Sequence, residues 1–513
     1  MKHDKQMIDI MKGIPRGLSS KYLKEQSLPQ ARWQSQKLIK NHPLLQYDPN
    51  NPKGKILFGA LGTQLLGLRD NRHILTIAGN RSGKSVMVIC NVLLYDGSIF
   101  IFDPKGEIAN RTARRRAEMG QDVYVIDPYN RAKGNAKRYK AKYNPMETLH
   151  IENDSIIEDV MQIIDGMIIK SDREEPHWNE ESANALMGFI LYVKFGNDIP
   201  ESKRNLIMVR ELISNALQTE IIEGEAVYKI PRQIMAGIEH LKGGPHEDIA
   251  ETIENSIRGL YNKPENERGS VLSTMKRHSA FLEYRSMKKL LSGHDLDLPD
   301  LKGNPKGMSV YLCFPATRIA ECQRLLRILL NQLMVAMETE ETVPESPVLA
   351  VLDEFPIVGF MSQLQNAAGQ IASFHLKLWI ICQDWGQGLS LYKERWESFA
   401  ANSGVIQSFA TVDLKTNEYL SKRLGKTSVL GVRQSDASYQ QVEKGVDGKN
   451  LSKELQDLLA PNEIEKTFGR SDPLKRQLIQ MAGLNPMILE RVTYYIKNAP
   501  YHHHFAGKYD QIK

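Results

Sequence analysis

Two acidic residues and one amide stand where apolar segments of this chain end. Asp353 and Glu354 follow the apolar run 348–352, and Gln383 follows the apolar run 378–382. Buried parallel strands read as continuous apolar runs, and α/β sheets place their chemistry at the carboxyl ends of such strands. An Asp there can hold Mg²⁺ through water, and the next Glu can orient and deprotonate an attacking water. We therefore predict Asp353 as a metal ligand, Glu354 as a catalytic base and Gln383 as an amide that senses a γ-phosphate.

A phosphate-binding loop is predicted upstream of these residues. The segment AGNRSGKS at 78–85 lies between the apolar stretch 74–77 and an expected helix over 84–94. Small residues let backbone N–H groups curl around phosphates at a helix N-terminus, where the helix dipole favours negative charge. Lys84 would reach the β- and γ-phosphates, and Ser85 would place its hydroxyl on Mg²⁺. With ATP and Mg²⁺ as ligands, the expected nucleotide contacts are Gly79, Asn80, Arg81, Ser82, Gly83, Lys84, Ser85 and Val86.

Both patterns also have plainer interpretations. A lone phosphate-loop pattern arises by chance, and an Asp-Glu pair often only begins a solvated loop. The placement of 78–85 between a strand and a helix argues against chance, and the apolar Phe355, Pro356 and Ile357 argue against a surface loop. For Gln383 the alternative is a satisfied polar residue at a strand end.

The apolar segments around these residues predict an α/β fold. Alternating strands and helices favour a parallel-rich sheet covered on both faces. Strands are expected at 74–77, 98–102, 123–126, 308–314, 348–352, 378–382 and 404–410.

Between 196 and 292 the strand pattern stops. Amphipathic stretches separated by Gly or Pro predict an all-α domain inserted into the α/β domain. The expected divisions are a polar basic N-terminal segment (1–53), the first part of a nucleotide-binding domain (54–195), the all-α insertion (196–292), and the second part of that domain with a C-terminal segment (293–513).

Composition describes an ordinary globular protein of 513 residues, with 41% hydrophobic and 25% charged residues. The formal net charge of +6 is too mild to indicate a nucleic-acid binder by itself. The four cysteines form no CxxC pair, so disulfides and thiolate metal sites are not expected, and a reducing cytoplasm fits. The apolar window 56–68 is shorter than the roughly 20 residues that span a bilayer, so no membrane crossing is expected.

Two basic segments could contact nucleic acid. Residues 111–142 hold ten Lys or Arg against three acidic residues, and 276–289 combine cations with Phe281 and Tyr284. Positive charge beside stackable rings suits a single strand. The alternative for both segments is a solvated cationic face with aromatic residues in the core.

Five motifs together resemble one family. They are IAGNRSGKS (77–85), IFIFDPKGE (99–107), EPHWNEESAN (175–184), VLAVLDEFPIVG (348–359) and ICQDWGQ (381–387). In this combination and order they resemble type IV secretion coupling proteins, the conjugative DNA-transfer ATPases related to hexameric DNA translocases. The resemblance extends over roughly residues 54–505.

The resemblance implies a RecA-like P-loop NTPase domain with an inserted all-helical domain, assembled as a homo-hexamer. It implies an ATPase that delivers single- or double-stranded DNA, bound to a relaxase, or protein substrates to a type IV secretion channel. Lys84, Ser85, Asp353, Glu354 and Gln383 match the family's phosphate-loop, magnesium, catalytic and sensor positions. Asp103 and Glu107 fall in the DPKGE signature, where a strand terminus and a helix-start acid are the alternatives. His177 and Trp178 match a position near the nucleotide, with packing of the loop as the alternative.

Three positions depart from the family pattern. Ala78 stands at the first phosphate-loop position in place of glycine, and 369–377 lacks the arginine that some members carry there. An arginine finger would have to come from elsewhere, with Arg395 and Arg423 as candidates, for which a surface or structural role is the alternative. Many members have two N-terminal transmembrane helices, which 1–53 does not show, so we expect a cytoplasmic protein recruited to the membrane by a partner.

Two other functions remain open at this stage. One is a docking receptor whose nucleotide controls assembly with little turnover, and the other is a DNA pump for segregation or packaging. The motif combination favours the coupling family over both.

Overall fold

The computed structural model describes residues 30–169, 176–367, 369–434 and 449–512. A mixed sheet of 11 strands forms its centre. Seven adjacent strands of this sheet run parallel, in the spatial order β11 (Ser403–Phe409), β3 (His73–Ala78), β10 (Leu376–Cys382), β9 (Val348–Asp353), β4 (Ile99–Phe102), β8 (Met308–Leu312) and β5 (Asp122–Ile126). The predicted parallel-rich sheet is confirmed.

Antiparallel strands that the sequence analysis did not predict extend the sheet beyond β11. They are, outward from β11, β14 (Arg476–Met481), β15 (Met487–Glu490), β1 (Ile56–Leu61) and β2 (Gln64–Leu68). The apolar window 56–68 is therefore the β1–β2 hairpin, which is buried because it pairs with the sheet.

Helices cover both faces of the sheet, as strand alternation requires. Leu75 and Ile77 of β3 contribute to one hydrophobic core, and Ile74 and Ala78 contribute to the other. The first core includes helices α6 (Ile156–Met167) and α14 (Ile319–Thr339). The second core includes helices α4 (Lys84–Val92) and α5 (Glu107–Glu118). All four cysteines are buried and free, which agrees with the expected absence of disulfides.

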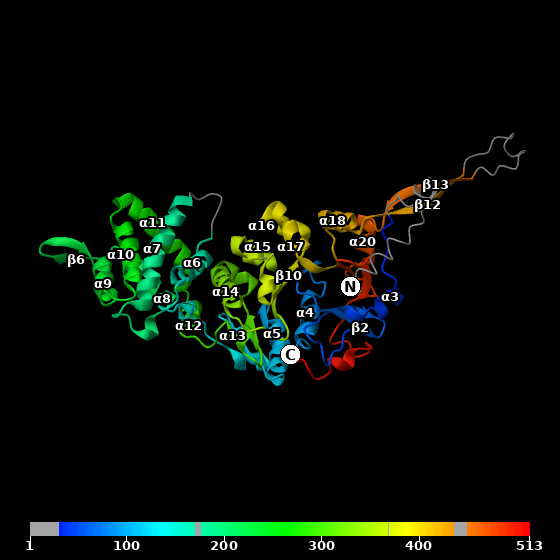
Figure 1. Ribbon diagram of the computed structural model, residues 1–513, viewed down its shortest axis with the longest axis horizontal. Helices are drawn as coiled ribbons and strands as arrows, with labels where there is room; N and C mark the ends of the chain where they lie inside the picture. Colours follow the sequence, from blue (N-terminus) through cyan, green and yellow to red (C-terminus); the bar gives the residue numbers. More distant parts are fainter. Residues whose placement is uncertain (1–29, 170–175, 368, 435–448, 513) are drawn as a thin grey trace, which may run out of the picture.

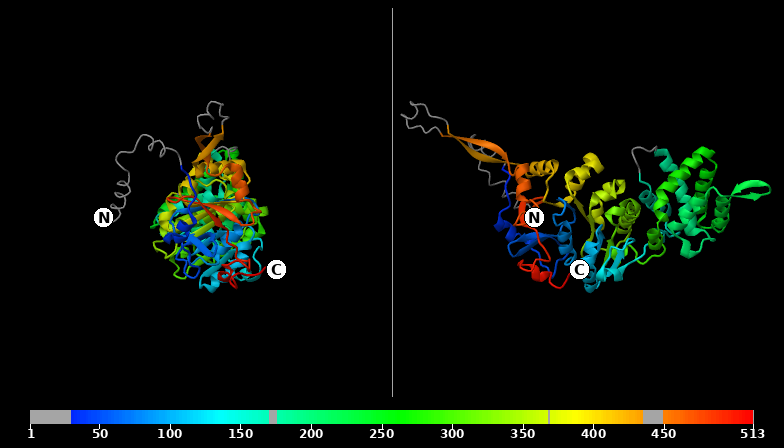
Figure 2. Two further views of the ribbon diagram at one scale, coloured as in Figure 1. Left: turned by 90° about the vertical axis from the view of Figure 1, so that its right-hand side faces the viewer. Right: turned by 180° about the vertical axis from the view of Figure 1, so that it is seen from behind.

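A body of helices lies at one end of the molecule (Figures 1 and 2). Its helices are α7 (Pro176–Phe195), α8 (Leu206–Asn215), α9 (Lys229–Gly237), α10 (Glu247–Tyr261), α11 (Glu265–Ser279) and α12 (Arg285–Leu291). Helix α7 packs against α10, α11 and α8, and α6 packs against both α7 and α14. The helical body thus includes α7, which precedes residue 196, and α6 joins this body to the sheet.

The helical body also contains one β-hairpin, which the sequence analysis did not predict. Strands β6 (Thr219–Ile222) and β7 (Glu225–Tyr228) pair antiparallel across a two-residue turn. Glu223 and Gly224 of the turn have φ of +52° and +89°. Two consecutive residues with positive φ give the tight turn that matches the twist of paired strands, and the flanking β-branched residues favour strands.

The remaining elements surround the sheet edge near β11 or connect its strands. They are α3 (Gln36–Asn41), α13 (Asp300–Gly303), α15 (Ser362–Ala367), α16 (Trp385–Tyr392), α17 (Trp396–Ala401), α18 (Leu414–Leu424), α20 (Pro461–Thr467), β12 (Lys426–Gln434) and β13 (Lys449–Asp457). The β12–β13 hairpin projects from the end of the molecule opposite the helical body (Figure 1). Of the N-terminal segment 1–53, residues 1–29 lie outside the described residues.

Among the described residues, no helix combines the length and the apolar character needed to cross a bilayer.

Candidate nucleotide-binding site

The predicted phosphate loop connects β3 to α4 and depends on two glycines. A Cβ at Gly79 would lie 2.1 Å from the carbonyl oxygen of Ala410, so only glycine fits against this backbone. Gly83 has a φ of +95° and directly precedes α4. No side chain caps the helix N-terminus, so its first N–H groups are left for a ligand.

Lys84 and Ser82 are placed for an anion in this loop. The Nζ of Lys84 donates a hydrogen bond of 3.0 Å to the carbonyl oxygen of Ala78, which holds the ammonium over the loop. Ser82 is only 7% exposed, and its buried hydroxyl oxygen has no hydrogen-bond partner among the described residues. A buried polar atom without a partner costs free energy, so a phosphate oxygen bound here would satisfy it.

Asp353 ends β9 beside the phosphate loop. Its Oδ2 accepts a 3.4 Å hydrogen bond from the hydroxyl of Ser85, so the two predicted metal ligands face each other. Burial raises the pKa of Asp353 to about 6; Lys84 opposes the rise, and the Glu354 carboxylate adds to it. Burial makes the ionised form of this carboxylate costly in the free protein. A divalent cation bound beside it would stabilise that ionised form by its charge.

Glu354 and Gln383 meet across the neighbouring strand ends. The Nε2 of Gln383 donates a 2.7 Å hydrogen bond to Oε1 of Glu354. Glu354 has a φ of +83°, a left-handed conformation that is strained for a non-glycine residue. The next residue, Phe355, is fully buried and stacks on Tyr392 and Trp396. This packing holds the strained turn, and the turn directs the carboxylate of Glu354 towards Gln383.

Asp103 directly follows β4, and its carboxylate binds N–H groups in the first turn of helix α5. Its carboxylate accepts hydrogen bonds from the backbone N–H groups of Glu107, at 3.1 Å, and Ala109, at 2.9 Å. Burial raises the pKa of Asp103 to about 7, and the nearby charges of Asp353 and Glu107 add to this. These hydrogen bonds favour a structural role for Asp103, at the end of a strand and the start of a helix, which was the alternative to a functional role in the DPKGE signature.

Two residues near the loop were not identified from the sequence. The Nη1 of Arg491 donates a 2.7 Å hydrogen bond to the carbonyl oxygen of Ser82, and its guanidinium lies 5.0 Å from the ring centre of Phe409. A cavity of about 210 Å³ opens there between the loop and the segment after β15. Lys105, in the turn after β4, lowers the pKa of Asp353 by its charge. Arg491 lies outside the five motifs, whereas Lys105 is part of the DPKGE signature, in which only Asp103 and Glu107 were singled out.

Other sequence candidates lie away from this site. His177 is 3.7 Å from Glu267 of α11 within the helical body, so it does not contact the phosphate loop. The guanidinium of Arg423 lies over the ring of Tyr419 and 3.7 Å from Glu397. Arg395 ends a short 3₁₀ helix between α16 and α17. Among the described residues, no cluster of three or more His, Cys, Asp or Glu side chains is arranged to hold a metal.

We expect Asp353→Asn to stabilise the ligand-free protein at neutral pH. Because folding raises the pKa of Asp353 from 3.8 to about 6, its contribution to stability falls as the pH rises through that interval. The uncharged amide removes a cost of about 3 kcal/mol above this range and changes little near pH 4. Thermal melting of both proteins at about pH 4 and about pH 7.5 measures the difference. An Asn variant that melts lower at the higher pH would contradict the assigned burial cost.

Comparison with known proteins identifies the family. The family model for type IV secretory system conjugative DNA transfer matches residues 21–510. The chain belongs to this family.

Relatives extend along most of the chain. A conjugal transfer protein TraG of Escherichia coli is 27% identical over 379 residues, which cover 71% of this chain and 57% of that protein. The type IV secretion system-coupling protein VirD4 of Bartonella henselae is 24% identical over 465 residues, which cover 87% of this chain and 67% of that protein. The chain therefore spans just over half the length of the TraG relative.

Solved structures show the same fold. The plasmid coupling protein TrwB in complex with ADP and Mg²⁺ matches with a TM-score of 0.59 at 14% identity, covering 92% of this chain and 95% of that chain. At this identity the likeness concerns the fold alone. It confirms the prediction of a RecA-like P-loop NTPase fold.

Proposed function

We propose that this chain is the coupling ATPase of a type IV secretion or conjugation system. In this role it hydrolyses ATP to recruit relaxase-bound DNA, or protein substrates, and deliver them to the transfer channel. The proposal rests on one observation: in a chain of this family, the phosphate loop, an acidic pair and an amide meet at one edge of the sheet.

ATP and Mg²⁺ fit the residues of this edge. The loop residues 79–86 offer backbone N–H groups, the ammonium of Lys84 and the unpartnered hydroxyl of Ser82 to the phosphates. Ser85 and Asp353 offer oxygen ligands, which Mg²⁺ prefers. The related TrwB has been solved with ADP and Mg²⁺ and with a non-hydrolysable ATP analogue. When bound, Mg²⁺ would supply charge stabilisation to the phosphates.

Glu354 is the proposed base, and Gln383 holds it in a resting position. In the free chain, Gln383 donates to the carboxylate oxygen that would accept a proton from water. This hydrogen bond orients the carboxylate and occupies an oxygen that would otherwise accept the proton. Movement of the Gln383 amide towards a terminal phosphate would release Glu354, so the two residues would couple nucleotide binding to hydrolysis. The cation that serves as an arginine finger would then come from a neighbouring subunit.

The proposed assembly and partners follow from the family. We propose a homo-hexamer at the cytoplasmic face of the cell membrane, held there by a membrane partner and the channel proteins. The proposed substrates are single- or double-stranded DNA with its relaxase. The relatives are a conjugal transfer protein and a secretion system-coupling protein, which supports this role. Within the chain, we propose a division into a nucleotide-binding domain and an inserted helical domain, with α7 assigned to the latter.

Measured ATP turnover with no DNA, single-stranded DNA and double-stranded DNA tests this function. A coupling motor is expected to hydrolyse ATP faster with DNA, because substrate engagement drives the conformational step that completes the site. A docking receptor would bind ATP with little turnover under all three conditions. A segregation or packaging pump would respond to double-stranded DNA alone. Either of the last two results would contradict the proposal.

A further inference from the structure

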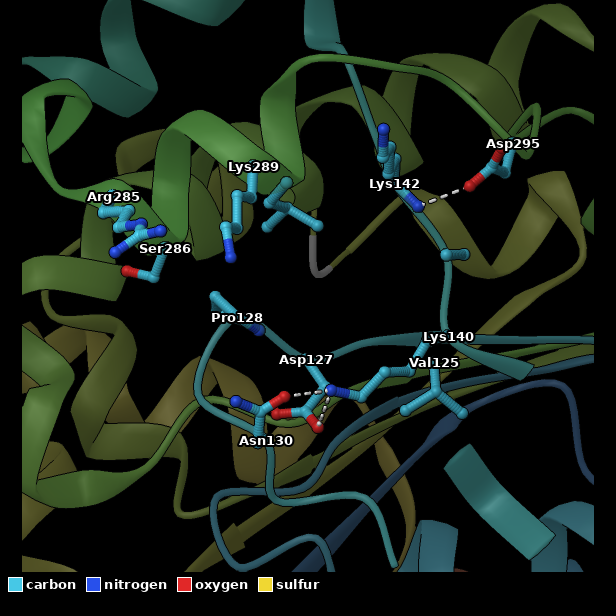
Figure 3. A pocket seen from close by; sticks show the side chains of 12 residues that line it. Val125, Asp127, Pro128, Asn130, Lys140, Lys142, Arg285, Ser286, Lys289 and Asp295 are labelled. Atoms are coloured by element: carbon cyan, nitrogen blue, oxygen red, sulfur yellow. Dashed lines mark hydrogen bonds and ion pairs between the residues drawn. The ribbon is translucent and has the colours of Figure 1, made fainter. Parts of the chain in front are cut away.

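A large cavity separates the helical body from the edge of the sheet. It has a volume of about 620 Å³, and Figure 3 shows the side chains around it. One wall is helix α12, which carries Arg285, Ser286 and Lys289. The other wall is the segment that follows the edge strand β5 and includes Lys140 and Lys142. The cavity thus lies between residues of two distinct parts of the chain.

Direct bonds tie the two walls together. The backbone N–H of Tyr143 donates a 3.1 Å hydrogen bond to the carbonyl oxygen of Leu290. A side-chain hydrogen bond joins Tyr129 to Ser286. A ligand in the cavity would contact both parts at a place where they already meet.

The acidic residues of the cavity are already satisfied. Asp127 accepts hydrogen bonds of 2.8 Å from the backbone N–H groups of Arg131 and Ala132, and it lies 3.3 Å from Nζ of Lys140. Asp295 accepts a 2.6 Å hydrogen bond from the backbone N–H of Lys142. Both carboxylates therefore already accept hydrogen bonds from residues of the cavity walls or next to them.

Four cations line the cavity, and among them Lys140 pairs with a carboxylate, that of Asp127. Across the described ranges, the side chains of Lys142, Arg285 and Lys289 make no ion pair with a carboxylate. The side chain of Lys289 extends from α12 towards Pro128 on the opposite wall, with Arg285 one turn away on the same helix (Figure 3). Like charges gathered around one cavity repel one another, and an anion between them would relieve that repulsion.

The cavity also combines the ends of the two basic segments noted in the sequence. Much of the first segment is committed elsewhere: Arg116 is fully buried, and Arg114 pairs with Asp510 and Glu118. Of the cations in this segment, Lys140 and Lys142 are the ones that line the cavity. In the second segment, Tyr284 does not line the cavity itself, but it is 47% exposed and directly precedes Arg285. An exposed ring beside cations is suited to a base that follows a bound phosphate.

We propose that this cavity binds phosphate groups of a single nucleic-acid strand. The proposal rests on the DNA-transfer function proposed above and assigns to it a contact surface away from the ATP site. Arg and Lys provide the charge-assisted hydrogen bonds that phosphates accept, and such contacts position a strand without reading its sequence. A strand held by α12 and by the segment after β5 would bridge the helical body and the nucleotide-binding domain.

The test is binding of a fluorescently labelled oligothymidine of about 20 nucleotides to the full chain, followed by anisotropy over a series of salt concentrations. The variant is Arg285→Gln with Lys289→Gln, both at exposed positions where glutamine keeps the helix. The matched control is Lys203→Gln with Lys229→Gln, which removes the same charge from exposed positions of the helical body. A third variant, Asp295→Asn, keeps an acceptor for the N–H of Lys142 and removes a negative charge.

We expect the double variant to weaken binding about tenfold at about 50 mM salt and to flatten the salt dependence by about 1.4 in log–log slope, as two lost single-strand contacts require. The control should change affinity by less than about twofold, and Asp295→Asn should tighten binding. Affinity equal to that of the control would overturn the proposal. Binding of inorganic pyrophosphate to the same proteins is measured as well. If the double variant loses pyrophosphate binding but keeps strand binding, the cavity binds a free phosphate ligand, and the proposal is overturned.

This experiment separates the inference from the function on which it rests. ATP turnover without DNA should be unchanged in the double variant, because neither residue contacts the phosphate loop. If wild type and control both fail to bind any strand, the DNA part of the proposed function fails as well. If they bind and the double variant binds equally, only the cavity assignment fails.

Discussion

Glu354→Gln is expected to bind ATP as the wild type does and to hydrolyse it about 10²–10⁴ times more slowly, since that is the usual contribution of a positioned base. The amide preserves the shape of the side chain but cannot take a proton from water. Its oxygen can still accept the 2.7 Å hydrogen bond from Gln383, so the local structure should persist. Phosphate release gives the hydrolysis rate and a binding titration gives the ATP affinity, both measured on one preparation of the protein.

The matched control for this variant is Glu341→Gln, which removes the same charge at an exposed position. It should hydrolyse ATP at the wild-type rate. A Glu354→Gln protein that also turned over near that rate would show that another group activates the water, and the assignment of Glu354 as base would be wrong.

Lys84→Ala is expected to lose tight ATP binding. Each charge-assisted hydrogen bond to a phosphate contributes about 1.5–3 kcal/mol, so losing one should weaken binding by about tenfold to about 150-fold. The free protein loses only the 3.0 Å bond to the carbonyl oxygen of Ala78, so its melting temperature should change little. Titration with a fluorescent ATP analogue, beside Lys422→Ala in α18 as the control, measures the effect. Undiminished affinity would remove Lys84 from the phosphate site.

The parallel centre of the fold could be predicted because it is buried on both faces. The run 348–352 contains only apolar residues, and the structure extends it by a single residue to Val348–Asp353. Since the ends of adjacent parallel strands share one edge, the same reasoning placed Asp353, Glu354 and Gln383 near one another. The hydrogen bond between the last two agrees with that placement.

The antiparallel strands could not be predicted in this way, since some of their buried residues are polar. Gln477 of β14 is fully buried and donates a 2.6 Å hydrogen bond to the carbonyl oxygen of Phe58. Its Oε1 accepts a 2.5 Å hydrogen bond from Gln407 of β11. In the sequence, such a glutamine looks like a solvent-exposed residue, because its partners are distant along the chain.

The same limit applies to the site. Arg491 contacts the phosphate loop through the carbonyl oxygen of Ser82, 409 residues away in sequence. Its place follows from the pairing of β14 and β15 with the sheet, which the sequence did not reveal. Motifs identified the residues that lie at strand ends, and tertiary contacts alone revealed those that approach from other segments.

Movement along a strand is the most direct test of a coupling motor. The full chain, with ATP and Mg²⁺, is mixed with a biotinylated single-stranded oligonucleotide that carries streptavidin at one end, and the release of streptavidin is followed over time. We predict release that requires ATP and is absent with Glu354→Gln, which binds nucleotide without hydrolysing it. A wild-type protein that binds the strand and hydrolyses ATP, yet never displaces streptavidin, would contradict the motor and favour a docking receptor.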